Sequence, residues 1–195
     1  MFNASKGAEM KNEAITLAGG CFWCIEAVFK RLKGVESVLS GYAGDGKANP
    51  TYDEVSAGNT GYTEALQIHF DPSVISLEKI FDVYWAVHDP TTLNRQGNDT
   101  GPQYRSAIFY SNTEQKNIAL KSIEQLKQSG KFKDPIVTAL EPFKQFYEAE
   151  QYHRDFYDKN REYGYCKLVI DPKITKLYKD FKEELKEEYL DTDIY

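Results

Sequence analysis

The 195-residue sequence has few cysteines, no long hydrophobic run and no excess of positive charge. Its three cysteines, an odd number, do not suggest a framework of structural disulfides, so we expect free thiols. No apolar run approaches the ~20 residues that a membrane span requires. The opening stretch, MFNASKGAEMKNEA, lacks the apolar centre of a secretory signal peptide. From these shortages we expect a cytoplasmic protein.

The charge balance and the composition limit the class of protein further. Lys and Arg number 24 against 30 Asp and Glu, which gives a net charge of −6 and argues against a nucleic-acid-binding surface. Hydrophobic residues make up 41% of the chain, enough for a substantial core, and the length requires no more than one domain. We expect residues 1–13 to be a flexible N-terminal extension and residues 14–195 to form a single domain.

A change of hydrophobic period marks a junction near the N-terminus. The stretch EAITLAGG is typical of a short buried strand that ends in glycines. From Cys21 onward the apolar residues recur at helical spacing, with Gly34 as a candidate C-terminal cap. The pattern therefore places Cys21 where a strand gives way to a helix.

The rest of the chain mixes strands and helices without strict alternation. Two long irregular stretches, residues 44–62 and 91–104, are rich in glycine and asparagine, and loops of this length are often functional. This mixture predicts an α+β fold, with a mixed sheet and helices packed against it. Strands are expected in VESVLSGYAG, EALQIHFDP, RSAIFYSN, DPIVTALEP and YCKLVID, and helices after Ser76, after Thr113, in AEQYHRDFYDKN and along Ile174, Leu177, Tyr178, Phe181 and Leu185.

The pair Cys21-x-x-Cys24 has several interpretations. A zinc site would need Cys166 and a histidine as further ligands (His69, His88 or His153), and no second paired motif is present, so we disfavour zinc. Small buried cysteines are common, and this interpretation suits Cys24 more than Cys21. A thiol at a helix N-terminus is stabilised as thiolate, which favours a reactive Cys21. The intervening Phe22 and Trp23 would form an apolar wall beside its sulfur.

The motifs together resemble the peptide methionine sulfoxide reductase family of the A type. GGCFWCIE is similar to the active-site motif of that family, and NPTYDEV, GNTGYTEALQIHFDP, HDPTTLNRQGNDTGPQYRSAIFY and AEQYHRDFY resemble its other motifs, in the same order. The resemblance implies an α+β fold with a ferredoxin-like core. It also implies an enzyme that reduces the S epimer of methionine sulfoxide, free or in proteins, with thioredoxin, or dithiothreitol in vitro, as external reductant and no bound cofactor or metal.

The resemblance also assigns roles to individual residues. It implies Cys21 as the nucleophile, Glu64 as the acid, and Tyr52 and Tyr104 as hydrogen-bonding partners of the substrate oxygen. Phe22 and Trp23 would bind the substrate methyl group, and Asp99 would line the site. Where the family usually has a histidine two residues before the acid, this chain has Tyr62. On their own, Glu64, the tyrosines and Asp99 are ordinary surface or turn residues, and we expect His153 to be a structural hydrogen-bonding residue.

The chemistry requires a second thiol to resolve a sulfenic acid on Cys21. Cys24 lies one helical turn away, at a spacing that fits disulfide geometry. Cys166 matches the region where the family commonly supplies its resolving thiol. We slightly favour Cys166, because a Cys21–Cys24 bond would strain the turn that carries the two aromatic residues. The rival functions are a thiol–disulfide oxidoreductase that uses Cys21 and Cys24, and a non-catalytic module that binds methionine side chains. We expect a monomer.

Overall fold

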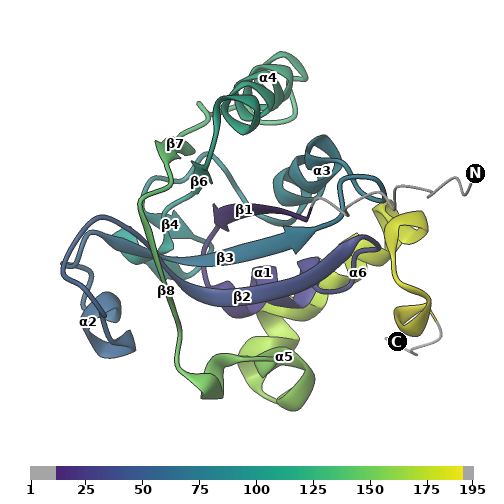
Figure 1. Ribbon diagram of the computed structural model, residues 1–195. Coiled ribbons are helices and arrows are strands. Elements are labelled where there is room, and N and C mark those ends of the chain that lie inside the picture. Colours follow the sequence, from purple (N-terminus) through teal and green to yellow (C-terminus); the bar gives the residue numbers. More distant parts are fainter. Residues whose placement is uncertain (1–11, 191–195) are drawn as a thin grey trace, which may run out of the picture.

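A computed structural model of the protein describes residues 12–190, built around one six-stranded sheet. The strand order is β7-β6-β1-β3-β2-β8, and every pairing is antiparallel except that of β6 with β7. Figure 1 shows α1, α5 and α6 on one side of β2 and β3. The strands are β1 (Glu13–Ala18), β2 (Val35–Gly44), β3 (Tyr62–Phe70), β6 (Ala107–Tyr110), β7 (Ala139–Pro142) and β8 (Gln145–Glu148), with a separate hairpin of β4 (Arg95–Gln96) and β5 (Asp99–Thr100).

The central part of the chain has ferredoxin-like topology, as the resemblance implies. The elements β1, α1, β2, β3, α3 and β6 follow one another along the chain, and their four strands have the order β6-β1-β3-β2. This arrangement confirms the predicted α+β fold with a mixed sheet. The helices are α1 (Phe22–Phe29), α2 (Tyr52–Ser56), α3 (Leu77–Val87), α4 (Thr113–Gln128), α5 (Phe156–Lys159) and α6 (Asp171–Asp180).

The two faces of the sheet are filled by different residues. Ile15 and Leu17 of β1 and Leu66 and Ile68 of β3 point into the main core, which they share with α1 and α3. Their neighbours in the chain point the opposite way, because side chains alternate along a strand. The second face carries a small cluster of mainly small residues: Ala18, Ala43, Ala65, Ala107 and Phe109. The helix-covered face is therefore the one on which a buried site can be built.

Several predicted boundaries are close to those of the structure. The Ser76 hydroxyl accepts a hydrogen bond from the Lys79 N–H and caps α3 as predicted. Helix α4 begins at Thr113 as predicted, and Asn112 caps it. The predicted extension over residues 1–13 lies outside the described residues as far as residue 11, and Glu13 is already the first residue of β1. None of the helices within residues 12–190 is long and apolar enough to cross a membrane.

Several predicted elements were wrong in type or extent. Helix α1 ends at Phe29, so Gly34 is not its cap, and α6 ends at Asp180, before the predicted Leu185. YCKLVID is helical rather than a strand: a wide helical turn, Cys166–Ile170, leads directly into α6. A short apolar run of this kind fits a buried helix as well as a strand, and burial of Cys166, Ile170, Ile174 and Leu177 at helical spacing decides for the helix. The stretch 44–62, predicted to be irregular, contains the capped helix α2. AEQYHRDFYDKN, predicted to be a helix, forms only short helical turns. DPIVTALEP, predicted to be a strand, is extended only in β7.

Candidate active site

The turn between β1 and α1 presents the Cys21 thiol. Gly20 in this turn has a φ of +88°, and a Cβ there would lie 2.5 Å from the Gln96 Cγ, so both the backbone and the packing require glycine. Cys21 is the N-cap residue of α1, and its side chain makes no capping hydrogen bond. The residue is only 7% exposed. The predicted strand-to-helix junction is thus confirmed, with the thiol at the helix start.

Glu64 reaches the same turn from the neighbouring strand. It lies on β3, on the face that α1 covers, and its Oε2 accepts the Phe22 N–H at 3.0 Å. Burial raises the pKa of Glu64 to about 8, against the opposing effect of the Phe22 N–H. The side chain is therefore largely protonated at neutral pH. A protonated carboxyl beside a thiol is what a proton donor in this site requires.

Two tyrosines reach the site from irregular stretches of the chain. Tyr52 begins α2, and its N–H donates to Glu150 Oε1 at 2.9 Å, while Tyr104 ends a helical turn, Pro102–Tyr104. Burial and then the Glu64 carboxylate raise the pKa of both tyrosines, so both phenols stay protonated. Both side chains therefore lie near Glu64 and offer hydroxyl donors to a substrate oxygen.

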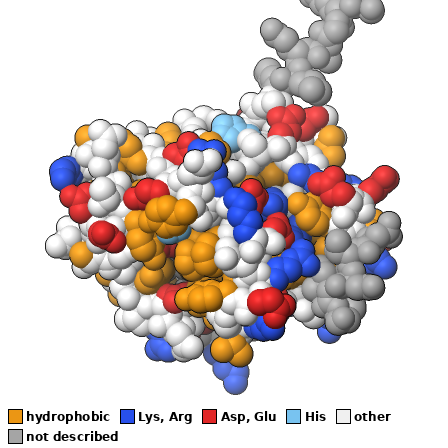
Figure 2. Space-filling view, turned by 90° about the horizontal axis from the view of Figure 1, so that it is seen from below, with side chains coloured by type: hydrophobic (Ala, Val, Ile, Leu, Met, Phe, Trp, Pro, Cys, Tyr) orange, Lys and Arg blue, Asp and Glu red, His pale blue; other side chains and the backbone are white. Residues whose placement is uncertain are grey.

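The aromatic residues next to Cys21 have different surroundings. Phe22 is fully buried, with its ring against Tyr42 and His153. Trp23 is partly exposed and stacks face to face on Phe156, with ring centroids 3.6 Å apart and planes 5° apart. Figure 2 shows hydrophobic side chains gathered on the face of the molecule seen from below. Trp23 is therefore the better placed of the two to form the wall of an open methyl pocket.

The two neighbouring thiols have opposite tendencies to ionise. Burial raises the pKa of Cys21, and its thiol hydrogen bond to Cys24 and the Glu64 carboxylate add to the effect. The same thiol–thiol hydrogen bond lowers the pKa of Cys24. In the resting site, burial therefore outweighs the lowering of the Cys21 pKa that was expected from the helix N-terminus. Cys21 rests as a thiol.

The third cysteine interacts with Cys24. Cys166 is fully buried, and burial raises the pKa of its thiol, with smaller contributions from Asp171 and Cys24. Tyr165, the residue before it, donates to Asp99 Oδ2 at 2.7 Å, and its hydroxyl lies 3.6 Å from Cys24 Sγ. Asp99 is therefore at the site as predicted, where it holds Tyr165 against the thiol pair.

The sequence did not indicate Tyr165 and Phe156 as site residues. Phe156 begins α5, and Tyr165 directly precedes the Cys166–Ile170 turn. The only sequence signal was that Phe156 lies three residues after His153 and that Tyr165 lies next to Cys166. His153 accepts the Trp23 indole N–H on Nδ1 at 3.1 Å, which confirms the structural role predicted for it. Tyr62 lies away from this centre: it donates to Gln145 Oε1 at 3.1 Å and contacts the Tyr147 ring.

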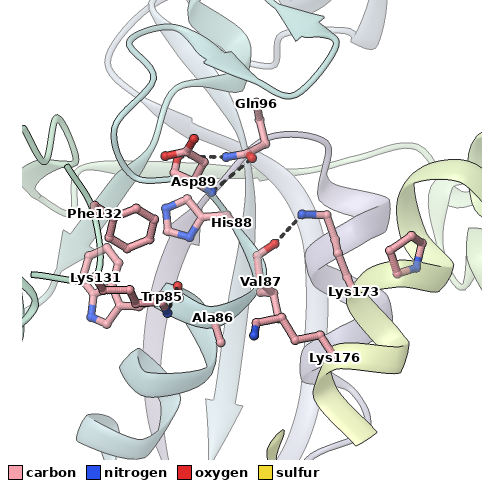
Figure 3. Close-up of a pocket in the computed structure, with 11 residues that line it drawn as sticks. Trp85, Ala86, Val87, His88, Asp89, Gln96, Lys131, Phe132, Lys173 and Lys176 are labelled. Atoms are coloured by element: carbon pink, nitrogen blue, oxygen red, sulfur yellow. Dashed lines mark hydrogen bonds between the residues drawn. The ribbon is translucent and has the colours of Figure 1, made fainter. Parts of the chain in front are cut away.

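A separate pocket lies at the C-terminal end of α3 (Figure 3). Two of its three lysines bind carbonyl groups at the helix end: Lys131 donates to Trp85 O and Lys173 to Val87 O. Burial lowers the pKa of His88 to about 3, so this histidine is neutral. In Figure 3 the Gln96 amide pairs with the backbone of Asp89. The pocket contains none of the predicted site residues.

Within residues 12–190, no three or more His, Cys, Asp or Glu side chains are grouped to hold a metal ion.

Comparisons with known proteins point to one family. A model of the family described as peptide methionine sulfoxide reductase matches residues 13–186. The peptide methionine sulfoxide reductase MsrA of Sulfolobus acidocaldarius is 55% identical over 172 residues, which are 88% of this chain and 97% of that protein. Mxr1 from Saccharomyces cerevisiae in reduced form has a TM-score of 0.75 and 36% identity, covering 84% of this chain and 94% of that chain. Mxr1 in complex with Trx2 has a TM-score of 0.54 and 28% identity, covering 79% and 91%.

Proposed function

The chain belongs to the peptide methionine sulfoxide reductase family and is an enzyme that reduces methionine sulfoxide to methionine, and we propose that Cys21 is its nucleophile and Glu64 its acid. The observation that carries this assignment is the single turn that brings both groups together. Phe22 N–H binds the Glu64 carboxyl, and Cys21 is the residue directly before it. The raised pKa of Glu64, about 8, keeps its proton available at neutral pH.

The first step transfers the sulfoxide oxygen to Cys21. Glu64 donates its proton to that oxygen while the Cys21 sulfur attacks the sulfoxide sulfur, and the Cys21 proton replaces the one that Glu64 has given. The hydroxyl formed on the substrate sulfur then moves to the Cys21 sulfur while the bond between the two sulfurs and the substrate S–O bond break. This releases the thioether and leaves a sulfenic acid on Cys21, so Cys21 is oxidised and the substrate is reduced by two electrons. Tyr52 and Tyr104 donate hydrogen bonds to the oxygen, Trp23 and Phe22 form the methyl pocket, and Asp99 orients Tyr165.

The contacts among the three thiols support a two-step reaction in which the Cys21 sulfenic acid is converted to a disulfide. The Cys24 thiol is hydrogen-bonded to Cys21, and the ionisation of Cys166 is affected by Cys24 and not by Cys21. This direct contact outweighs the strain argument that favoured Cys166. We assign the first attack on the sulfenic acid to Cys24, which forms a Cys21–Cys24 disulfide and releases water. The Cys166 thiol then attacks the Cys24 sulfur and frees Cys21. An external dithiol reduces the final Cys24–Cys166 disulfide.

Thioredoxin is the dithiol that we propose as reductant. The complex of the related Mxr1 with Trx2 supports this choice. The substrates in this proposal are oxidised proteins and free methionine sulfoxide, acted on by a monomer whose residues 14–195 are one catalytic domain, with no nucleic-acid partner. The free state of all three cysteines supports a reducing, cytoplasmic location.

One assay separates this function from its rivals. The protein is incubated with dithiothreitol and each epimer of a blocked methionine sulfoxide, and the thioether product is measured. We expect the S epimer to be consumed and the R epimer to remain. A thiol–disulfide oxidoreductase or a binding module would consume neither epimer, and that result would overturn the proposal.

A further inference from the structure

A row of polar contacts joins α1 to α5, away from the reacting thiols. Glu26 Oε1 accepts the Asp155 N–H at 3.2 Å. Lys30 Nζ lies 2.5 Å from Asp155 Oδ1 and 2.8 Å from Asp158 Oδ2, and the Arg31 guanidinium lies 2.6 Å from Asp158 Oδ1. Residues 26 and 30 are one helical turn apart, so one face of α1 makes these contacts. The reduction chemistry described above uses none of these groups.

The Glu26 contact holds an unfavourable backbone conformation. Asp155 has a φ of +55° and a ψ of +29°, in the left-handed region that residues other than glycine rarely adopt. Glu26 is 3% exposed, so its carboxyl oxygen is a fixed acceptor for the Asp155 N–H rather than a mobile surface group. Such a conformation persists only where the surroundings fix it.

The next residue in the chain is the one that supports Trp23. Phe156 follows Asp155, and its ring lies flat on the indole of Trp23. The edge of the same indole is held by His153, which accepts its N–H. Trp23 is thus fixed on one face by Phe156 and at its nitrogen by His153, with the Tyr165 ring edge-on against it at a centroid distance of 6.0 Å.

We propose that Glu26 is a positioning residue for the methyl pocket. By holding Asp155 in the left-handed conformation, it places Phe156 behind Trp23 and keeps the indole at the distance that fits a methyl group. The inference rests on the proposed role of Trp23 as the wall of that pocket. It predicts that loss of Glu26 widens the pocket and reduces selectivity for methyl sulfoxides over larger alkyl sulfoxides.

The test compares kcat/KM for blocked methionine sulfoxide and for blocked ethionine sulfoxide, which carries one more methylene. One methylene in a fitted apolar pocket is discriminated by about 10-fold or more. We expect Glu26→Ala to lose most of this selectivity, and Glu26→Gln, which keeps an acceptor oxygen for the Asp155 N–H, to retain it. Phe156→Leu removes the supporting ring without disturbing Glu26 and should lose selectivity in the same way, which keeps the test decisive if Glu26→Ala does not fold.

Gln115→Ala is the matched control. Gln115 is also 3% exposed and also accepts a backbone N–H, that of Ser111, but it lies on α4 away from the site. It should lower thermal stability and leave the selectivity ratio unchanged. Unchanged ratios in both Glu26→Ala and Phe156→Leu would overturn the inference while the wild type stays active. A wild type that reduces neither sulfoxide would instead refute the proposed function.

Discussion

A buried glutamate lies near each end of α1, and the two glutamates have different surroundings. At the N-terminal end, Glu64 accepts the Phe22 N–H and faces Cys21 and two protonated tyrosines. Towards the C-terminal end, Glu26 accepts the Asp155 N–H beside the ion pairs of Lys30. Burial raises the pKa of both, to about 8 and about 7. Burial alone therefore does not distinguish the two carboxyls; the Cys21 thiol and the tyrosine hydroxyl groups near Glu64 do.

Among the predicted changes near the N-terminal end of α1, removal of the Cys21 thiol should lower turnover the most. We expect Cys21→Ser to abolish turnover, because an alcohol at its ordinary pKa cannot replace a thiolate. Single-turnover formation of the thioether measures this directly. A Ser variant that kept more than about a tenth of the rate would remove Cys21 from the nucleophile role. Circular dichroism should show an unchanged fold, since serine is close to cysteine in size.

Removing the acid tests the role that separates Glu64 from Glu26. Glu64→Gln should lower the single-turnover rate by about 10²–10⁴, because an amide cannot deliver a proton. In the wild type the rate should fall as the pH rises through about 8, where Glu64 loses its proton. If the variant kept the same high-pH fall, another group would be the acid. Glu26→Gln is the matched control and should leave the rate nearly unchanged.

The resolving thiols can be ordered by counting free thiols after one equivalent of sulfoxide. The wild type should retain one free thiol of its three. Cys24→Ser should retain one thiol and a sulfenic acid on Cys21 that reacts with dimedone, whereas Cys166→Ser should retain none, since its two thiols join. A disulfide between Cys21 and Cys166 in the Cys24→Ser variant would contradict the proposed order and make Cys166 the direct resolving thiol.

Truncating the pocket wall should have a smaller effect. Trp23→Ala should lower kcat/KM for a methyl sulfoxide by about tenfold, because one methyl group in an apolar pocket contributes ~1 kcal/mol or somewhat more. The rate with a sulfoxide that carries a different group in place of the methyl should change less. Equal losses for both substrates would mean that Trp23 only supports the fold.

The last prediction concerns stability instead of turnover, and it treats the two carboxyls alike. Each binds a proton more tightly in the folded state than at its ordinary pKa of 4.5. The free energy of unfolding should therefore fall as the pH rises from 4.5 to the raised pKa, by about 1.4 kcal/mol per pH unit for each group. Glu64→Gln should flatten this fall up to about pH 8 and Glu26→Gln up to about pH 7. Urea denaturation at several pH values measures it, and unchanged slopes would contradict the raised pKa values.

The sequence by itself determined the elements that carry the reacting groups. The glycines before Cys21 and the helical spacing after it identify the turn, because glycine and a change of period are local signals. The alternation along EALQIHF identifies the strand of Glu64 in the same way. Family motifs then named Tyr52, Tyr104 and Asp99, which no local pattern distinguishes from surface residues.

Only the tertiary structure decided what surrounds these groups. YCKLVID is helical because its apolar residues pack against α1, a contact that the local sequence does not contain. β8 pairs with β2 at the sheet edge, where the partner strand supplies the hydrogen bonds. The contacts of Tyr165 with Cys24 and of Glu26 with Asp155 join residues 141 and 129 positions apart. Local patterns reflect the preferences of neighbouring residues, whereas burial, pKa values and the order of the thiols depend on which distant segments fold against one another.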